Sequence, residues 1–185
     1  EQAQRRAELD AQQQQQTDAG IATPGADGAA VSADVAPGAA QNFANRDAAL
    51  AATGRVAIQT ESLSGSINLV GGRLDDLHLT HYRETVDPQS PTITLLSPAG
   101  APNAFFVEQG WVPAGGGSTE VPDNTTTWTA KGNATLTASS PVTLTYDNGE
   151  GLIFRRTFAV DDDYLFTVTQ SVENTTSGDV ALFPY

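Results

Sequence analysis

The sequence predicts an all-β protein, an antiparallel β-sandwich preceded by an N-terminal tail. Three observations predict this fold class. Short runs of alternating apolar and polar residues begin at Arg55 and continue along the chain. Gly, Pro, Asn and Asp separate these runs, and Thr, Val and aromatic residues fill them, as suits a half-buried pleated surface. No segment after residue 52 has the 3.6-residue apolar period of an amphipathic helix.

The first 52 residues have a different composition, dominated by Ala, Gln, Gly, Asp and Pro, with the low-complexity run "AQQQQQT". Such a segment cannot bury enough apolar surface to offset the entropy lost on ordering. The first sixteen residues favour a helix by composition, but no apolar stripe would hold it in place. We therefore predict a tether over 1–52, disordered or partly helical, and a β domain over 53–185.

The first predicted strands include one hairpin. "RVAIQT" places Val56 and Ile58 on one face, and "SINLV" is followed by the adjacent glycines Gly71 and Gly72. Glycine tolerates positive φ angles, so this pair predicts the turn into "RLDDLHLTHY".

The region Val142–Asn174 predicts a three-stranded antiparallel meander. "VTLTY" and "LIFRRTFAV" are separated by "DNGEG", a hairpin turn in which Asn148 and Gly149 would supply the positive φ angles. The acidic run Asp161–Asp163 predicts the next chain reversal, before "LFTVTQSVEN".

Charge and composition exclude several classes of function. The formal net charge is -13 and the pI is about 4.2, so the surface repels phosphate backbones, and we expect no nucleic-acid partner. The absence of cysteine removes disulfides, thiolate metal sites and cysteine nucleophiles. No apolar run approaches the roughly 20 residues that span a bilayer. The chain begins without Met and ends on the strand-like "ALFPY", so we expect a fragment whose sandwich is incomplete at the C-terminus.

Two histidines beside two aspartates are the first candidates for a metal or catalytic site. His78 and His81 are three residues apart, so on a strand they point to opposite faces and cannot bind one ion together. Asp76 and His78 share a face, which provides two ligands where zinc takes three or four. We expect His81 on the buried side with Leu77 and Leu79, and a solvated Asp76/His78 face. Asp75 is the fourth member of the group.

Other motifs also favour structural interpretations. "DDDYLFTV" lacks the Gly and Glu that a calcium loop needs at its sixth and twelfth positions. "PAGGGSTE" lacks the lysine of a phosphate-binding loop. Arg155 and Arg156 point to opposite faces of one strand, and we expect Arg156 to be half-buried and paired with an acid. A glycosidase-type carboxylate pair stays open among the 22 acidic residues, but nothing in the sequence marks any two of them. We therefore predict no catalytic, cofactor-binding or metal-binding residue, no cofactor and no enzyme activity.

The order and spacing of these strands resemble the periplasmic domain of YidC-type membrane protein insertases, from about Arg55 to the end. The residues that carry the resemblance are glycines, aromatic residues and alternating apolar positions, together with one arginine and one asparagine: Gly71, Gly72, Leu74, Leu77, Leu79, Tyr82, Leu96, Gly110, Trp111, Phe154, Arg156, Phe158, Tyr164, Val168, Val172 and Asn174.

The resemblance implies a β-supersandwich of the galactose-mutarotase-like kind, located on the periplasmic side of the bacterial inner membrane. It implies that the domain is a non-catalytic scaffold or docking module, because insertion is attributed to later membrane helices. The implied partners are the Sec translocon with its accessory subunits and nascent inner-membrane proteins. Membrane anchoring would come from segments outside this chain.

Two other classes of function compete with this interpretation. The first is a carbohydrate-binding or mutarotase-like sandwich, which fold analogy alone supports. A mutarotase needs an acid and a base that face one cleft, and two histidines three apart on one strand argue against this. The second is a secreted adhesin or appendage subunit, which the Thr-rich strands allow but do not favour.

Overall fold

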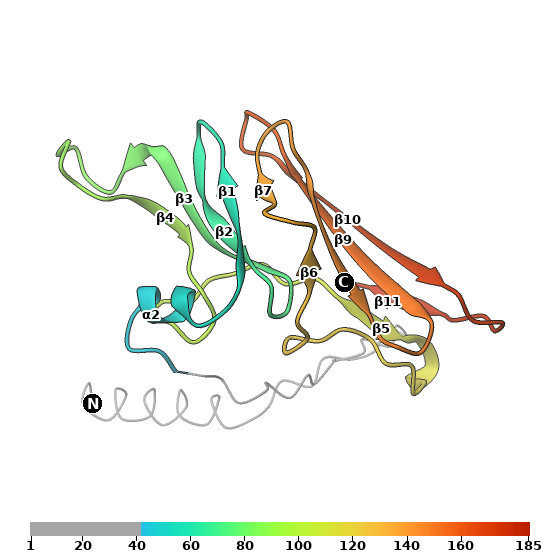
Figure 1. Cartoon of the computed structure of the whole chain (residues 1–185). Helices are drawn as coiled ribbons and strands as arrows, with labels where there is room; N and C mark the ends of the chain where they lie inside the picture. The colour runs from blue at the N-terminus through green and yellow to red at the C-terminus, as the bar shows by residue number, and fades with distance from the viewer. Residues whose placement is uncertain (1–41) are drawn as a thin grey trace, which may run out of the picture. The chain divides into compact units, whose positions relative to one another are not determined.

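The computed structural model describes residues 42–185, and this part is built almost entirely from antiparallel strands in three sheets. Its helical segments are α2 (Arg46–Ala51) and a single 3-10 turn, η1 (Ala114–Gly116). Figure 1 shows the two larger sheets lying next to one another. The predicted all-β sandwich is confirmed.

The larger sheet has five strands in the order β4-β3-β2-β1-β7. Their bounds are β1 (Arg55–Gln59), β2 (Leu63–Asn68), β3 (Arg73–Arg83), β4 (Thr92–Leu96) and β7 (Thr135–Leu136). Neighbouring strands are antiparallel, except that the short β7 runs parallel to β1. This pairing attaches a late segment of the chain to the first strand.

The second sheet has the order β10-β9-β8-β6, and a two-stranded ribbon pairs β11 with β5. Their bounds are β5 (Trp111–Pro113), β6 (Thr129–Ala130), β8 (Val142–Asp147), β9 (Leu152–Val160), β10 (Phe166–Asn174) and β11 (Leu182–Pro184). Strands β8, β9 and β10 pair antiparallel in sequence order, so the predicted meander is confirmed.

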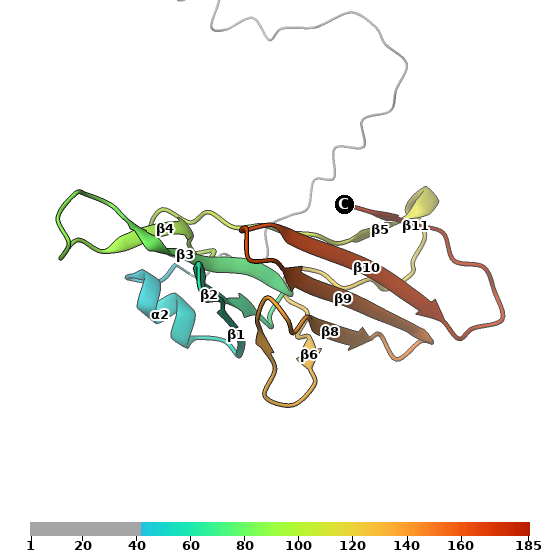
Figure 2. The ribbon, with the colours of Figure 1, turned by 90° about the horizontal axis from the view of Figure 1, so that it is seen from above.

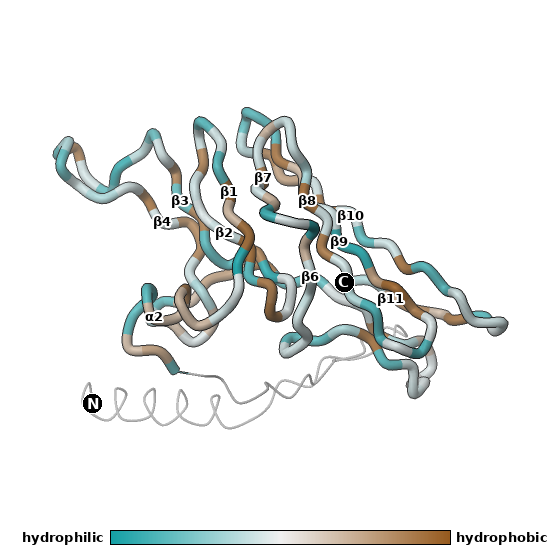
Figure 3. The backbone as a smooth tube through the Cα atoms, in the orientation of Figure 1, coloured by the Kyte–Doolittle hydropathy of each residue, from teal (hydrophilic) through white to brown (hydrophobic). Residues whose placement is uncertain are grey.

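The core lies between the two larger sheets and follows the alternation of the sequence. Strand β9 is the clearest case, because every second residue from Leu152 to Val160 is buried. Val56 and Ile58 of β1 are buried in the same cluster as Phe154 and Phe158 of β9. Figure 3 shows the hydrophobic positions spaced along these strands. The shared face predicted for Val56 and Ile58 of β1 is therefore confirmed.

The turns agree with the prediction except at one residue. Gly71 and Gly72 have φ angles of 76° and 60° and connect β2 to β3, as expected. In the β8–β9 turn the positive φ angles belong to Gly149 and Gly151. Asn148 instead accepts hydrogen bonds at Oδ1 from the backbone N–H groups of Glu150 and Leu152, so its predicted positive φ is wrong.

Helix α2 lies within the range predicted as tether, 1–52. Its N-cap is Asn45, whose Oδ1 accepts a hydrogen bond from the backbone N–H of Ala48. Figure 2 shows α2 against one face of the five-stranded sheet. Residues 1–41, including the predicted helical start, lie outside the described residues.

Candidate functional site

A β-bulge in strand β3 creates the first candidate site. Ser66 of β2 lies opposite Asp76, whereas the next residue, Ile67, lies opposite Leu74. Asp75 is therefore an extra residue with no partner in the register. Because of the bulge, Leu74 still faces the core while both aspartates reach the opposite face of the sheet.

Two arginines neutralise these two aspartates. Arg55 of β1 donates to Asp75 Oδ1, and Arg46 of α2 donates to Asp76 Oδ1. Ser66 joins the two pairs, because it accepts from Arg55 Nε at 2.7 Å and donates to Asp76 Oδ2 at 2.5 Å. The aspartate side chains are only 1% and 9% exposed, so each needs a cation close by.

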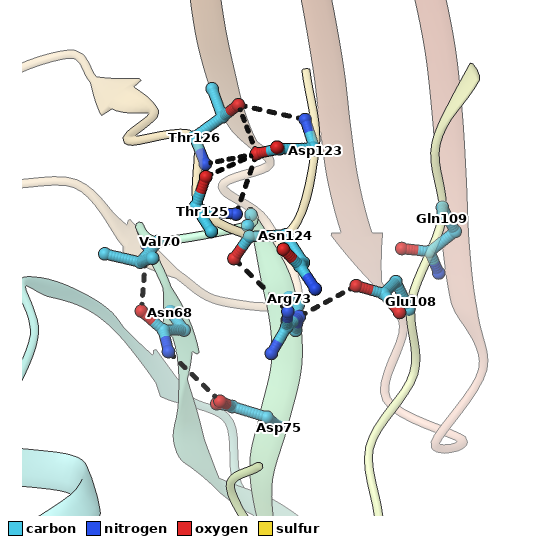
Figure 4. A network of polar contacts seen from close by, with 12 residues as sticks. Asn68, Val70, Arg73, Asp75, Glu108, Gln109, Asp123, Asn124, Thr125 and Thr126 are labelled. Carbon is cyan, nitrogen blue, oxygen red and sulfur yellow. Dashed lines mark hydrogen bonds and ion pairs between the residues drawn. The ribbon is translucent and has the colours of Figure 1, made fainter. Parts of the chain in front are cut away.

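Figure 4 shows the other end of this network, where Asn68 Nδ2 donates to Asp75 Oδ2 at 3.2 Å. Asp75 thus has both carboxylate oxygens occupied. We conclude that the two ion pairs stabilise the packing of strands β1, β2 and β3 and attach α2 to these strands.

The expected solvated Asp76/His78 face is wrong, because Arg46 of α2 pairs with Asp76 and the Asp76 and His78 side chains are only 9% and 24% exposed. His78 Nε2 lies 3.5 Å from Asp76 Oδ1, and Nδ1 lies 3.2 Å from Thr94 Oγ1 of β4. Burial is the main cause that lowers the pKa of His78 below 6.5; Arg46 adds to this effect and Asp76 partly opposes it. The shared face of Asp76 and His78 is as predicted.

The expected burial of His81 is also wrong, although it follows Leu77 and Leu79 on the same face. Pairing of β2 with β3 ends at Leu79, and residues 81–83 of β3 extend beyond it and are exposed. Within residues 42–185, no group of three His, Cys, Asp or Glu side chains is arranged to hold a metal ion.

The second candidate site surrounds Arg156 of β9, which is only 1% exposed. Its Nη1 donates to the carbonyl oxygens of Gly71 at 3.2 Å and Gly72 at 2.7 Å. Its Nη2 donates to the carbonyl oxygen of Gln109 and lies 3.5 Å from Gln170 Oε1.

Two tryptophan rings enclose the same guanidinium group. The Arg156 Cζ atom lies 4.8 Å from the ring centre of Trp128 and 5.6 Å from that of Trp111, within the range of cation–π attraction. The rings themselves stack, with centroids 6.2 Å apart. Burial lowers the pKa of Arg156 to about 10, so the group remains charged at neutral pH.

The predicted acid partner of Arg156 is therefore wrong, and so is its half-burial. The five N–H donors of a guanidinium fit carbonyl oxygens that strand pairing leaves free. The Gly71-Gly72 turn and the segment before β5 provide such oxygens. Arg155 does face the other way, as predicted, and forms a 2.7 Å ion pair with Glu173.

A third polar cluster holds the loop 123–126 against the start of β3. Arg73 Nη2 donates to the carbonyl oxygen of Asn124 at 3.2 Å, and its Nε donates to Glu108 at 3.0 Å (Figure 4). Burial raises the pKa of Asp123, but hydrogen bonds from Thr125 and Thr126 outweigh it and hold this pKa below 3.8. These contacts order a loop.

A cavity of about 250 Å³ opens between the β8–β10 sheet and the β5–β11 ribbon. Its apolar lining consists of Trp111, Leu152, Val172, Val180, Leu182 and Pro184. Asn174 also lines it, but its amide already bonds Gly178 and Thr176. The cavity thus lacks the free convergent polar groups that orient a sugar or a cofactor.

The two loops considered in the sequence adopt turn structures. Asp161 Oδ1 accepts from the backbone N–H groups of Asp163 and Leu165, so the acidic run reverses the chain as predicted. The segment "PAGGGSTE" begins at the end of β5 and contains η1. Neither α2 nor η1, the helical segments of the described residues, has the length or apolar character of a bilayer-spanning helix.

The sequence did not predict the ion pairs of Arg46 and Arg55 or the burial of Asp75. One signal for the bulge is present in the sequence. Leu74 and Leu77 are three residues apart on one strand, so both can face the core only if an extra residue lies between them. The arginine partners have no comparable signal, because they are 20 and 30 residues away.

The fold and these sites together define an antiparallel β-sandwich domain whose buried polar groups connect its strands and loops. The family model described as "YidC periplasmic domain" matches residues 55–185, which is most of the chain. The chain belongs to this family.

Relatives in several bacteria share about half of their residues with this chain over the matched region. A protein of Nitrobacter hamburgensis is 54% identical over 146 residues, which is 79% of this chain and 24% of the relative. One of Methylobacterium nodulans is 56% identical over 140 residues, or 76% and 23%. One of Dinoroseobacter shibae is 53% identical over 153 residues, or 82% and 25%. Each is named membrane protein insertase YidC, and the chain spans about a quarter of their length.

Proposed function

We propose that this chain is the periplasmic part of a bacterial inner-membrane protein insertase and that it acts there as a non-catalytic scaffold or docking module. The observation that carries this proposal is the match of residues 55–185 to the periplasmic-domain family. The names of the relatives support the activity of the whole protein, which this chain would serve as one part. The partners we propose are nascent inner-membrane proteins and the Sec translocon with its accessory subunits.

The contacts of the polar side chains support a non-catalytic role. Asp75, Asp76 and Arg156 are buried, and each is bonded to other parts of the domain. His78 is bonded to Thr94 and lies beside Asp76, where it has a structural partner on each ring nitrogen. The contacts of these polar groups are with other residues of the same domain. We therefore propose that the domain acts through its shape and its surface.

A carbohydrate-binding or mutarotase-like function is the alternative, and the apolar cavity beside Trp111 is the place to look for it. Calorimetry with a panel of hexoses should give no heat. A saturable heat that disappears on Trp111→Ala, with the fold retained, would favour the alternative.

Location and role are tested separately in a bacterium that produces the whole protein. Protease added to spheroplasts should digest the β domain from outside, and full protection of the domain would contradict a periplasmic location. Capture of a Sec subunit with the whole protein should weaken when residues 53–185 are deleted, and unchanged capture would remove the docking role.

The non-catalytic assignment is tested with single substitutions at polar groups. We expect His78→Gln and Glu173→Gln to leave insertion of a reporter membrane protein unchanged. A folded variant of this kind that abolishes insertion would show that one side chain performs chemistry.

A further inference from the structure

Helix α2 is joined to the rest of the domain by one ion pair and by a small apolar contact, to which the half-buried Leu50 contributes. Of its six residues only Ala49 is buried. Arg46, by contrast, reaches across to Asp76 of β3, 30 residues away in sequence. Apart from these contacts, the segment before the helix is held by a 2.9 Å hydrogen bond from the backbone N–H of Phe43 to the carbonyl oxygen of Gly100.

The surroundings of Asp76 favour a cation close by, but they also provide polar partners other than Arg46. Its side chain is 9% exposed, so a charged partner nearby is strongly favoured. Without Arg46, it would still accept the hydrogen bond from Ser66 Oγ at 2.5 Å and face His78 Nε2 at 3.5 Å. The second ion pair, Arg55 with Asp75, involves no residue of α2 and would remain.

The core does not depend on α2 either. The buried cluster that joins the two larger sheets runs from Val56 to Val160 and includes no residue of the helix. Local opening is cheapest where few apolar contacts are lost, and α2 fits this description.

We propose that α2 is a releasable latch: opening of the Arg46–Asp76 contact frees the N-terminal segment from the five-stranded sheet while the sandwich stays folded. This inference rests on the proposed function and on the predicted tether over 1–52, which would link the domain to membrane segments outside this chain. Release of residues 43–53 would lengthen that link by on the order of 30 Å at the reach of an extended chain. The latch would thus set how far the domain stands from its anchor and would uncover the Asp76 carboxylate when open.

Trypsin provides a direct test, because Arg46 is itself a cleavage site that the closed latch protects. The full 185-residue chain and its Asp76→Asn variant are digested briefly, and the fragment cut after Arg46 is measured by mass spectrometry. We expect at least about tenfold faster cleavage in Asp76→Asn, since the neutral amide no longer holds the guanidinium. Glu173→Gln, which removes the exposed pair with Arg155, is the matched control and should leave this rate unchanged.

Fluorescence of the buried Trp111 and Trp128 reports on the core in the same samples. It should not change in Asp76→Asn. An unchanged cleavage rate would show that charge does not hold the helix. Faster cleavage accompanied by loss of the native tryptophan signal would show that α2 is an integral part of the fold, which also overturns the latch.

A second variant keeps the test decisive if Asp76→Asn does not fold. In Arg46→Gln, amides of residues 47–52 should exchange with deuterium faster while those of β9 keep their protection; equal rates would refute the latch. Both measurements use the chain in solution, so they succeed or fail independently of insertion in cells. Failure of the insertion experiments would remove only the membrane role of the latch.

Discussion

At the scale of single residues, the most informative side chain is Arg156. It brings together the Gly71-Gly72 turn, the segment before β5 and the two tryptophans, all distant from it in sequence. Burying a cation without an acid is costly, so its hydrogen bonds and the aromatic faces must offset the lost hydration. The result is one residue that ties the two larger sheets to the connecting loop.

Replacing Arg156 should therefore destabilise the domain strongly. Arg156→Met keeps much of the volume but removes the donor from the buried carbonyl oxygens of Gly71 and Gly72, each worth about 1–3 kcal/mol, and from the part-buried carbonyl oxygen of Gln109. We expect a loss of at least about 3 kcal/mol in the free energy of unfolding, measured with urea. Arg155→Met, which removes only an exposed pair, should cost about 1 kcal/mol or less. Equal losses in the two variants would contradict the role assigned to Arg156.

The lowered pKa of His78 predicts a dependence of stability on pH. The folded domain binds a proton at His78 less readily than the unfolded chain, whose pKa is near 6.5. The contribution of His78 to the free energy of unfolding is therefore fully present above pH 6.5. It is lost as the pH drops below that value toward the lower pKa of the folded state.

We expect His78→Gln to lose less stability than the wild type between about pH 7 and pH 5, measured as the urea midpoint. His81→Gln, on the exposed end of the same strand, provides the control and should behave as the wild type. A His78→Gln profile that overlays the wild type would exclude this residue as the cause.

At the scale of elements, the turns and the β-bulge determine which side chains come into contact. The β2–β3 turn holds Gly72 at a φ of 60°, and a Cβ added there would lie 2.9 Å from Arg156 Nη1 and 3.0 Å from Trp128 Nε1. The glycine is needed both for its backbone conformation and for this close approach. At Gly149, with a φ of 73°, nothing lies within 4 Å of the added atom.

These two glycines separate backbone strain from steric conflict. Gly149→Ala should cost only the left-handed backbone strain, about 1 kcal/mol. Gly72→Ala carries the same strain and also displaces Arg156 or Trp128, so we expect a distinctly larger loss in unfolding free energy, by about 1–3 kcal/mol more. Thermal or urea unfolding of both variants makes the comparison, and equal costs would show that the Arg156 site adapts freely.

At the scale of the whole molecule, two larger sheets share one core and one long edge remains unpaired. Among the described strands, β10 pairs with β9 alone, although it is nine residues long. Its inward residues Phe166, Val168 and Val172 are only partly buried against the core. An uncovered edge of this length, flanked by half-buried apolar side chains, favours pairing with another chain.

The chain by itself should therefore self-associate in solution. Sedimentation velocity is expected to show a dimer or larger species whose fraction grows with concentration. Thr169→Lys places a charge on the edge strand, which edge strands tolerate and which discourages pairing, and should shift the distribution toward monomer. A monomer at all concentrations in the unmodified chain would show that the edge is protected.

The sequence by itself determined the class of the fold, most of its strands and its family. Period-two alternation and turn residues are local properties, so β9, the β8–β10 meander and the Gly71-Gly72 turn could be predicted from neighbouring residues. Only the tertiary structure decided what the polar side chains contact. Arg156 bonds carbonyls 47 and 85 residues away, and Asp76 meets an arginine from the predicted tether. Such partners depend on how sheets, bulge and helix come together in space, and no local pattern records that arrangement.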